Sequence, residues 1–273
     1  MNPAIDHRSL NAPSGLGILG GLGPLASADF LLSIYEHNMG EREQQTPTVF
    51  LHSLPSIPDR TECFLNGRDD ELLALLERAL DDLAGFGVAR MVIACITFHH
   101  LLPRLPARFA GKIISLVDLT LEHVARSRRP HMLLCTNGTR QMRIFERHEK
   151  WSRVESHIIR PDGEDQQRIH ETIYSVIKSN RELTPVIELL QSLAQKYAVR
   201  SFIAGCTEFH RVSRLIARDE RLAERIDFTD SLLIIAKNYE ELINEKCTRL
   251  VEPELRKIPG ETRHHLAGYE HHL

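Results

Sequence analysis

The sequence predicts an α/β fold built from two similar domains, each a parallel sheet flanked by helices. Short, wholly apolar runs alternate with amphipathic segments along the chain, which is typical of parallel strands that helices cover on both faces. One short sequence pattern also occurs in each half, directly after an apolar run. We therefore expect two copies of one unit, related by a pseudo-twofold axis, with an active-site cleft between them where the strands end.

The individual elements follow from hydrophobic periodicity and from the glycines and prolines that interrupt it. The expected strands of the first half are 16–19, 48–51, 91–94 and 113–116, and its expected helices are 26–38 and 69–86. The expected strands of the second half are 132–134, 157–159, 201–204 and 226–228. Its expected helices are 119–125, 140–148, 166–178, 184–197 and 231–245.

The chain of 273 residues is long enough for two such units. We expect the first domain to comprise residues 15–117 together with a returning segment, 230–250, and the second domain to comprise 118–229. Residues 251–273 differ in composition, since they hold prolines, glycines and two His-His pairs. We interpret them as a polar C-terminal tail in preference to a metal site.

Composition and charge exclude several classes of partner. The formal net charge is only -3, so neither nucleic acid nor a membrane surface is an expected partner. No apolar run approaches the ~18 residues of a transmembrane helix, and the polar N-terminus has no signal-peptide core, so we expect a cytoplasmic protein. The 5 cysteines are dispersed, which argues against disulfides and zinc. We expect neither a metal nor a cofactor.

A Gly-rich segment near the N-terminus partly fits a dinucleotide-binding fingerprint. Gly15, Gly17 and Gly20 have the Gly-x-Gly-x-x-Gly spacing, but no strand precedes Gly15. Because the apolar strand residues lie inside the motif instead of before it, we exclude nucleotide binding.

The pattern that occurs in both halves is Cys-x-x-Phe-His. It begins at Cys95 in the first half and at Cys206 in the second, and each copy follows an expected strand. Two related units place equivalent strand ends opposite each other, and ligands of open α/β sheets bind beyond the carboxyl ends of the strands. We therefore expect both cysteines to line one cleft from opposite sides.

Two thiols that flank a substrate are suited to racemisation. This reaction removes the α-proton from one face of a carbon atom and returns a proton to the other face. A thiol has a reference pKa of about 8.5, and a helix N-terminus favours the thiolate further. We predict Cys95 and Cys206 as the catalytic acid/base pair. The remaining cysteines, Cys63, Cys135 and Cys247, are interpreted as small buried side chains.

With these residues in view, the sequence resembles the aspartate/glutamate racemase family, especially its aspartate racemase-like branch. The resemblance extends from about Leu16 to Tyr239. The segments that are similar to family motifs are 17–26, 57–61, 136–139, 161–166, 205–208 and 230–231.

The resemblance implies a cofactor-independent amino-acid racemase that acts on a small aspartate- or glutamate-like substrate. Arg60 would bind a substrate carboxylate through its planar fork. Glu208 would hold the substrate ammonium or orient a neighbour. The other expected substrate-binding residues are small or hydroxyl-bearing: Gly21, Gly23, Thr97, Thr136, Gly138, Thr139 and Thr207. Family members are often dimers, so a homodimer is an expectation of the resemblance alone.

The sequence departs from the family at the first cysteine. The family usually reads Cys-Asn-Thr-Ala-His there, whereas Ile96 and Phe98 replace the asparagine and the alanine. One lost hydrogen bond to the substrate is worth roughly 0.5–1.5 kcal/mol. A racemase of a less polar amino acid, a maleate-type isomerase on the same scaffold and an inactive binding protein therefore stay open as alternatives.

Overall fold

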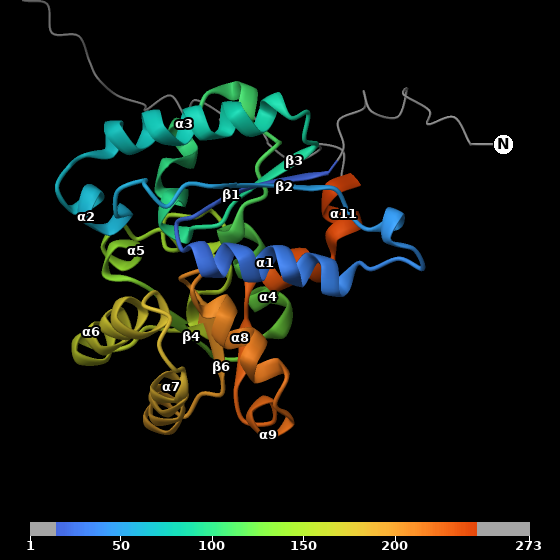
Figure 1. The fold of residues 1–273 in the computed structure, drawn as a ribbon. Coiled ribbons are helices and arrows are strands. Elements are labelled where there is room, and N and C mark those ends of the chain that lie inside the picture. The colour runs from blue at the N-terminus through green and yellow to red at the C-terminus, as the bar shows by residue number, and fades with distance from the viewer. Residues whose placement is uncertain (1–14, 245–273) are drawn as a thin grey trace, which may run out of the picture.

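The computed structural model describes residues 15–244 of the chain as two parallel β-sheets surrounded by helices (Figure 1). The first sheet has the strand order β2-β1-β3, and the second has the order β5-β4-β6-β7. Every neighbouring pair of strands is parallel. The predicted fold class is therefore confirmed. The predicted tail 251–273, Cys247 and the N-terminal residues 1–14 lie outside the described residues.

The elements have the following bounds. The strands are β1 (Leu16–Gly20), β2 (Val49–Ser53), β3 (Arg90–Ile93), β4 (His131–Leu134), β5 (Ile158–Ile159), β6 (Ser201–Ala204) and β7 (Asp227–Thr229). The helices of the first half are α1 (Pro24–His37), η2 (Glu43–Gln45), α2 (Arg60–Leu65), α3 (Asp69–Gly85), η3 (Ile96–Arg104) and η4 (Ala107–Phe109). Those that follow are α4 (Leu116–Ser127), α5 (Asn137–Gln141), η5 (Trp151–Arg153), η6 (Glu155–His157), α6 (Gly163–Thr172), η7 (Ile173–Ile177), α7 (Thr184–Tyr197), α8 (Phe209–Ala217), α9 (Glu220–Ala223), α10 (Ser231–Lys237) and α11 (Tyr239–Asn244).

The strand order of the first sheet recurs in the second. In each half the first strand lies in the middle, with the second strand on one side and the third on the other, and β7 extends the second sheet. Strands β3 and β6 are therefore equivalent, and they are the strands that Cys95 and Cys206 follow. The recurrence agrees with the duplicated unit that the Cys-x-x-Phe-His pattern predicts.

The largest hydrophobic core is shared by the two sheets. Leu16 and Val92 of the first sheet lie in the same buried cluster as Leu133 and Ile203 of the second. A separate cluster fills the space between the first sheet and α3. Another packs α6, α7 and α8 against the second sheet. The inner faces of both sheets contribute to the shared cluster together with helices α1, α4 and α10, whereas the outer face of each sheet has a core of its own.

The last helices pack against elements from the beginning of the chain. The Asn38 side chain donates to the carbonyl oxygen of Ala236 at 2.7 Å, and the Tyr239 hydroxyl donates to the carbonyl oxygen of Thr48 at 3.2 Å. In Figure 1, α11 lies beside the strands of the first sheet. The chain thus packs against its first half again after β7, while the predicted domain boundaries stay a prediction.

Several local expectations were wrong. Residues 113–116 form a single bridge, Ile113 to Met91, because α4 already begins at Leu116 with Ser115 as its N-cap. The expected helix 140–148 ends at Gln141, shortly before Arg143 adopts a left-handed φ of 53°. The final helix is interrupted at Asn238.

The segments after the cysteines also differ from the expected α-helices. Cys95 is followed by a 3-10 helix, η3, which contains Pro103, and Cys206 is followed by a turn before α8 begins at Phe209. Among residues 15–244 no helix is long and apolar enough to cross a membrane.

Candidate active site

The two cysteines lie at the carboxyl ends of the equivalent strands β3 and β6, where contacts join the two halves. Cys95 is buried and Cys206 is partly buried. The Thr207 hydroxyl, next to Cys206, donates to the carbonyl oxygen of Ala94 at 3.1 Å. The strand ends therefore meet, and the sulfur of Cys95 is close enough to raise the pKa of Cys206. Neither cysteine is among the residues that line the adjacent cavity, so their predicted position in one cleft stays a prediction.

A cavity of about 330 Å³ opens beside these strand ends and is lined by both halves of the chain. The first half contributes the turn after β1, the start of α1 and the loop that leads into α2, and the second half contributes η7, the residue after it and the loop before α8. The lining residues are Gly21, Leu22, Gly23, Pro24, Leu25, Pro55, Ile57, Asp59, Arg60, Tyr174, Lys178 and Glu208. The cavity thus contains four of the predicted binding residues, namely Gly21, Gly23, Arg60 and Glu208.

Arg60 connects the cavity to Cys95. It is the first residue of α2, only 8% exposed, and its guanidinium donates to the carbonyl oxygens of Pro58 at 3.0 Å and of Leu22 at 2.5 Å. Burial alone would lower the pKa of Arg60, but the hydrogen-bonded sulfur of Cys95 and the carboxylate of Asp59 raise it overall. Arg60 therefore stays a cation and lies against the first of the two sulfur atoms.

Lys178 takes the corresponding place beside Cys206. Its ammonium lies 3.4 Å from a carboxylate oxygen of Asp59 and 3.8 Å from the centre of the Tyr174 ring. Burial lowers the pKa of Lys178, but Cys206, Tyr174 and Asp59 together raise it. The Tyr174 hydroxyl donates to the same oxygen of Asp59 at 2.8 Å, so this group of residues joins the two halves across the cavity.

Cys206 and Glu208 share a corner of the site. Glu208 is 2% exposed, and one of its carboxylate oxygens, Oε1, has no hydrogen-bond partner. Burial raises the pKa of Glu208 despite the nearby Lys178, Arg211 and Arg60. Burial and the charge of Glu208 raise the pKa of Cys206 to about 12, against the opposing effect of Lys178. Cys206 therefore carries a proton at neutral pH when the cavity is empty.

The glycines of the first turn allow this close packing. Gly21 has a φ of +82°, and a Cβ atom there would lie 2.3 Å from the backbone nitrogen of Leu54. At Gly23 a Cβ atom would lie only 1.5 Å from Oε1 of Glu208. The absent side chain of Gly23 therefore creates the space that the Glu208 carboxylate occupies.

The threonine residues lie beside the cavity but not in its lining. Thr97 and Thr139 share a hydrogen bond of 3.0 Å between their hydroxyls, and Thr136 caps α5 by accepting from the Thr139 N–H at 3.3 Å. A Cβ atom at Gly138 would lie 2.5 Å from the Thr61 hydroxyl. These groups hold the two halves together at the strand ends, and their predicted contact with the substrate stays a prediction.

The unusual residues after Cys95 are directed away from the cavity. Ile96 is buried in the shared core, and Phe98 is fully buried in the core beneath α3. Neither side chain lines the cavity, so neither reduces its size nor makes it less polar. The family's asparagine donor is nevertheless absent at position 96, so a less polar substrate stays an open alternative.

The histidines of the repeated pattern have structural partners. His99 is bonded through Nδ1 to the carbonyl oxygen of Cys95 at 3.1 Å and accepts the Leu116 N–H through Nε2 at 2.9 Å. Burial lowers its pKa to about 4, in agreement with a neutral ring. His210 lies 2.6 Å from a carboxylate oxygen of Asp230 and 2.9 Å from the Ser33 hydroxyl. Both rings position the loops that carry the cysteines.

Sequence reasoning missed Asp59, Tyr174 and Lys178. Asp59 lies in a segment with a recognisable motif, but only its arginine neighbour was assigned a function. Tyr174 lies within η7, a π-helical turn, and Lys178 follows it directly, so a regular helical pattern does not show where these side chains point. In the described part of the chain no group of His, Cys, Asp and Glu residues is suited to hold a metal ion.

Two equivalent α/β units that meet at a polar cavity, with a cysteine at the same strand end of each, define an enzyme of the amino-acid racemase class. The chain belongs to the Asp/Glu/Hydantoin racemase family, which its sequence matches over residues 19–237. The family assigns the protein to the isomerases.

Solved structures with the same fold agree with this assignment. An aspartate racemase of Picrophilus torridus superposes with a TM-score of 0.67 at 22% identity, over 84% of this chain and 98% of that one. A putative Asp/Glu racemase of Yersinia pestis gives 0.64 at 18% identity, over 84% and 98%. A glutamate racemase of Francisella tularensis, in complex with D-glutamate, gives 0.54 at 17% identity, over 89% and 85%.

Proposed function

We propose that this protein interconverts the enantiomers of an acidic amino acid, with Cys95 and Cys206 as a two-base pair and without a cofactor. The observation that supports this most strongly is the equivalence of β3 and β6, since one of the two cysteines follows each strand and a hydrogen bond joins the two strand ends. Two thiols on opposite sides of a carbon atom supply the base and the acid that racemisation requires.

The starting protonation states follow from the surroundings of the two sulfur atoms. Cys206 begins as the thiol, because burial and Glu208 raise its pKa to about 12. We assign Cys95 the role of the base, because the cationic guanidinium of Arg60 lies beside its sulfur and favours a negative charge there. Cys95 then removes the α-proton from one face, and the Cys206 thiol donates its proton to the other. In the reverse direction the two residues exchange roles.

The charges around the cavity favour a dicarboxylic amino acid. Arg60 and Lys178 are both cationic and lie beside different cysteines, so each can bind one carboxylate of such a substrate. The unpartnered oxygen of Glu208 supplies an acceptor for the α-ammonium. Asp59 holds Lys178 when the cavity is empty, and the substrate carboxylate would compete with it for the ammonium.

The test is isotope exchange at the α-carbon. Each enantiomer of aspartate and of glutamate, followed by a panel of neutral amino acids, is incubated with the protein in D2O and examined by NMR and chiral chromatography. We expect deuterium at the α-carbon of an acidic amino acid together with formation of its enantiomer. Cys95→Ser and Cys206→Ser should each abolish racemisation, whereas Cys63→Ser, at a buried cysteine outside the cavity lining, should not. Absence of exchange with every amino acid tested would refute the proposal.

A further inference from the structure

Glu208 has an environment that a simple binding residue does not require. Its Oε1 is buried without a hydrogen-bond partner in the space left by Gly23. An unpaired buried carboxylate oxygen is costly, because the desolvation of a charged group is not compensated. Glu208 follows Cys206 by two residues; its backbone N–H lowers the pKa of the thiol, whereas its carboxylate raises this pKa more strongly. A negative charge on Glu208 therefore acts on Cys206 at close range.

Among residues 15–244, no other charged group near Cys206 has the same effect on its thiol as the carboxylate of Glu208. Lys178 lies beside both groups and favours their ionised forms, and the sulfur of Cys95 acts on Cys206 in the opposite sense. Arg211, Arg60 and Asp29 act on Glu208. Cys135, on the neighbouring strand end, interacts with Cys206, but burial raises its own pKa and keeps it neutral. Glu208 is thus the carboxylate that most directly opposes a second negative charge on Cys206.

We propose that Glu208 is a positioning residue that keeps Cys206 protonated in the free enzyme, and that pairing with the substrate ammonium removes this restraint during turnover. The second half of the proposal rests on the proposed function. The Cys206 S–H bond breaks as a bond from hydrogen to the α-carbon forms, while the Cys95 thiolate gains the proton that leaves the opposite face. The new Cys206 thiolate then lies beside Glu208, and the ammonium group of the product compensates the charge of the Glu208 carboxylate.

The first experiment requires no substrate. The rates at which iodoacetamide alkylates Cys206 and Cys95 are measured by peptide mass spectrometry between about pH 7 and 9.5, in the full-length protein and in Glu208→Gln. Without the carboxylate, the pKa of Cys206 should fall by about one unit or more. Alkylation at a given pH should then rise about threefold, because a less basic thiolate is also a weaker nucleophile.

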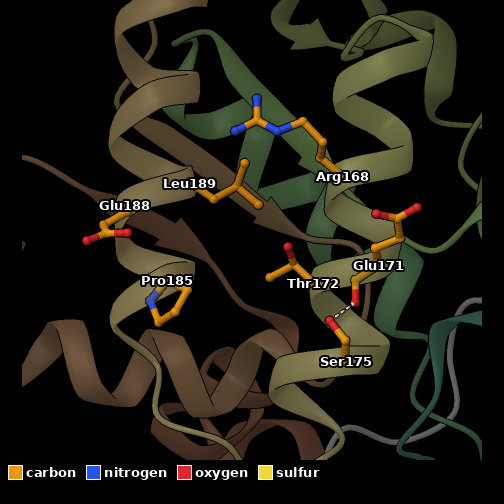
Figure 2. A pocket seen from close by; sticks show the side chains of 7 residues that line it. All are labelled: Arg168, Glu171, Thr172, Ser175, Pro185, Glu188 and Leu189. Atoms are coloured by element: carbon orange, nitrogen blue, oxygen red, sulfur yellow. Dashed lines mark hydrogen bonds between the residues drawn. The ribbon is translucent and has the colours of Figure 1, made fainter.

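The matched control is Glu171→Gln. Glu171 is an exposed residue of α6 beside the groove that α6 and η7 form with α7, where Arg168, Ser175 and Glu188 also lie (Figure 2). This change removes the same charge from the surface and should leave both alkylation rates unchanged. An unchanged or slower rate at Cys206 in Glu208→Gln would overturn the proposal. Equal acceleration of Cys95 would indicate a general opening of the cleft and would overturn it as well.

The second experiment uses turnover. The upper pKa in the pH profile of kcat/KM reports loss of the proton that the free enzyme must retain. We expect Glu208→Gln to move this limb to lower pH by about one unit or more, and Glu208→Asp, which keeps the charge, to leave it near its original position. An upper limb that does not move in Glu208→Gln contradicts the assignment. If neither the unmodified protein nor any variant catalyses racemisation, the proposed function fails. The alkylation rates then still decide whether Glu208 controls the protonation of Cys206.

Discussion

Gly23→Ala tests the arrangement of the cavity with a single added carbon atom. Gly23 precedes α1 with a φ of -159°, an extended conformation that alanine also adopts, so the backbone itself does not resist the change. The new Cβ atom would lie 1.5 Å from Oε1 of Glu208, whereas real Cβ contacts are essentially never under 3.0 Å. The carboxylate must therefore retreat by about 1.5 Å, the difference between these distances.

Because Oε1 is the end of a flexible side chain, we expect the fold to absorb this movement and the site to lose its geometry. A misplacement of ~1 Å costs about 10²-fold in rate. The expected result for Gly23→Ala is a fall of about 10²-fold in kcat/KM, with a melting temperature close to that of the original protein. The assay is circular dichroism of the enantiomers during racemisation, combined with thermal unfolding.

Gly163→Ala is the matched control, because nothing lies within 4 Å of a Cβ atom at that position. It should keep full activity. If Gly23→Ala folds and racemises as fast as the control, the position of the Glu208 carboxylate does not matter for catalysis and the reasoning fails.

Two further predictions concern stability. The pKa of His99, about 4 in the folded protein, lies below its ordinary value of 6.5, so an acidifying solution protonates the unfolded chain first. This contribution to the free energy of unfolding is complete above about pH 6.5 and declines toward pH 4. In His99→Gln, the free energy of unfolding measured with urea should fall less steeply over this range, by up to about 1.4 kcal/mol per pH unit. An identical slope in the variant would show that His99 titrates normally. Asp230 and Asp219 cap α10 and α9 through similar bonds, but Asp230 alone pairs with the buried His210. Urea unfolding should show a loss of about 1 kcal/mol for Asp219→Ala and of about 4 kcal/mol for Asp230→Ala; equal losses would mean that the buried pair adds nothing.

The sequence predicted those parts of the fold that depend on local patterns. Apolar runs located the strands because a strand buried on both faces has few polar residues, and the repeated Cys-x-x-Phe-His pattern related β3 to β6. The termini of α5 were not predictable in the same way, since a left-handed Arg143 rather than a glycine follows its end. A strand was predicted over residues 113–116, but only the bridge of Ile113 forms because α4 begins shortly after it.

The candidate site was predicted as far as its residues belong to motifs. Arg60 and Glu208 lie in such segments and do line the cavity. Tyr174 and Lys178 reach it only because the chain passes through a π-helical turn and because the two halves pack together, and neither fact has a local sequence signal. The side chains of Ile96 and Phe98 were expected to affect the substrate, but tertiary packing directs them into the core.

The apolar cluster that both sheets share has a consequence for how such a chain could arise. Separating the halves would divide this cluster, with Leu16 and Val92 on one piece and Leu133 and Ile203 on the other, and would expose part of its apolar surface to water. A single ancestral unit would have exposed this apolar face, which a second copy of the same unit could cover. Gene fusion would then have joined two protomers whose contact already existed, and afterwards each copy was free to acquire different neighbours for its cysteine.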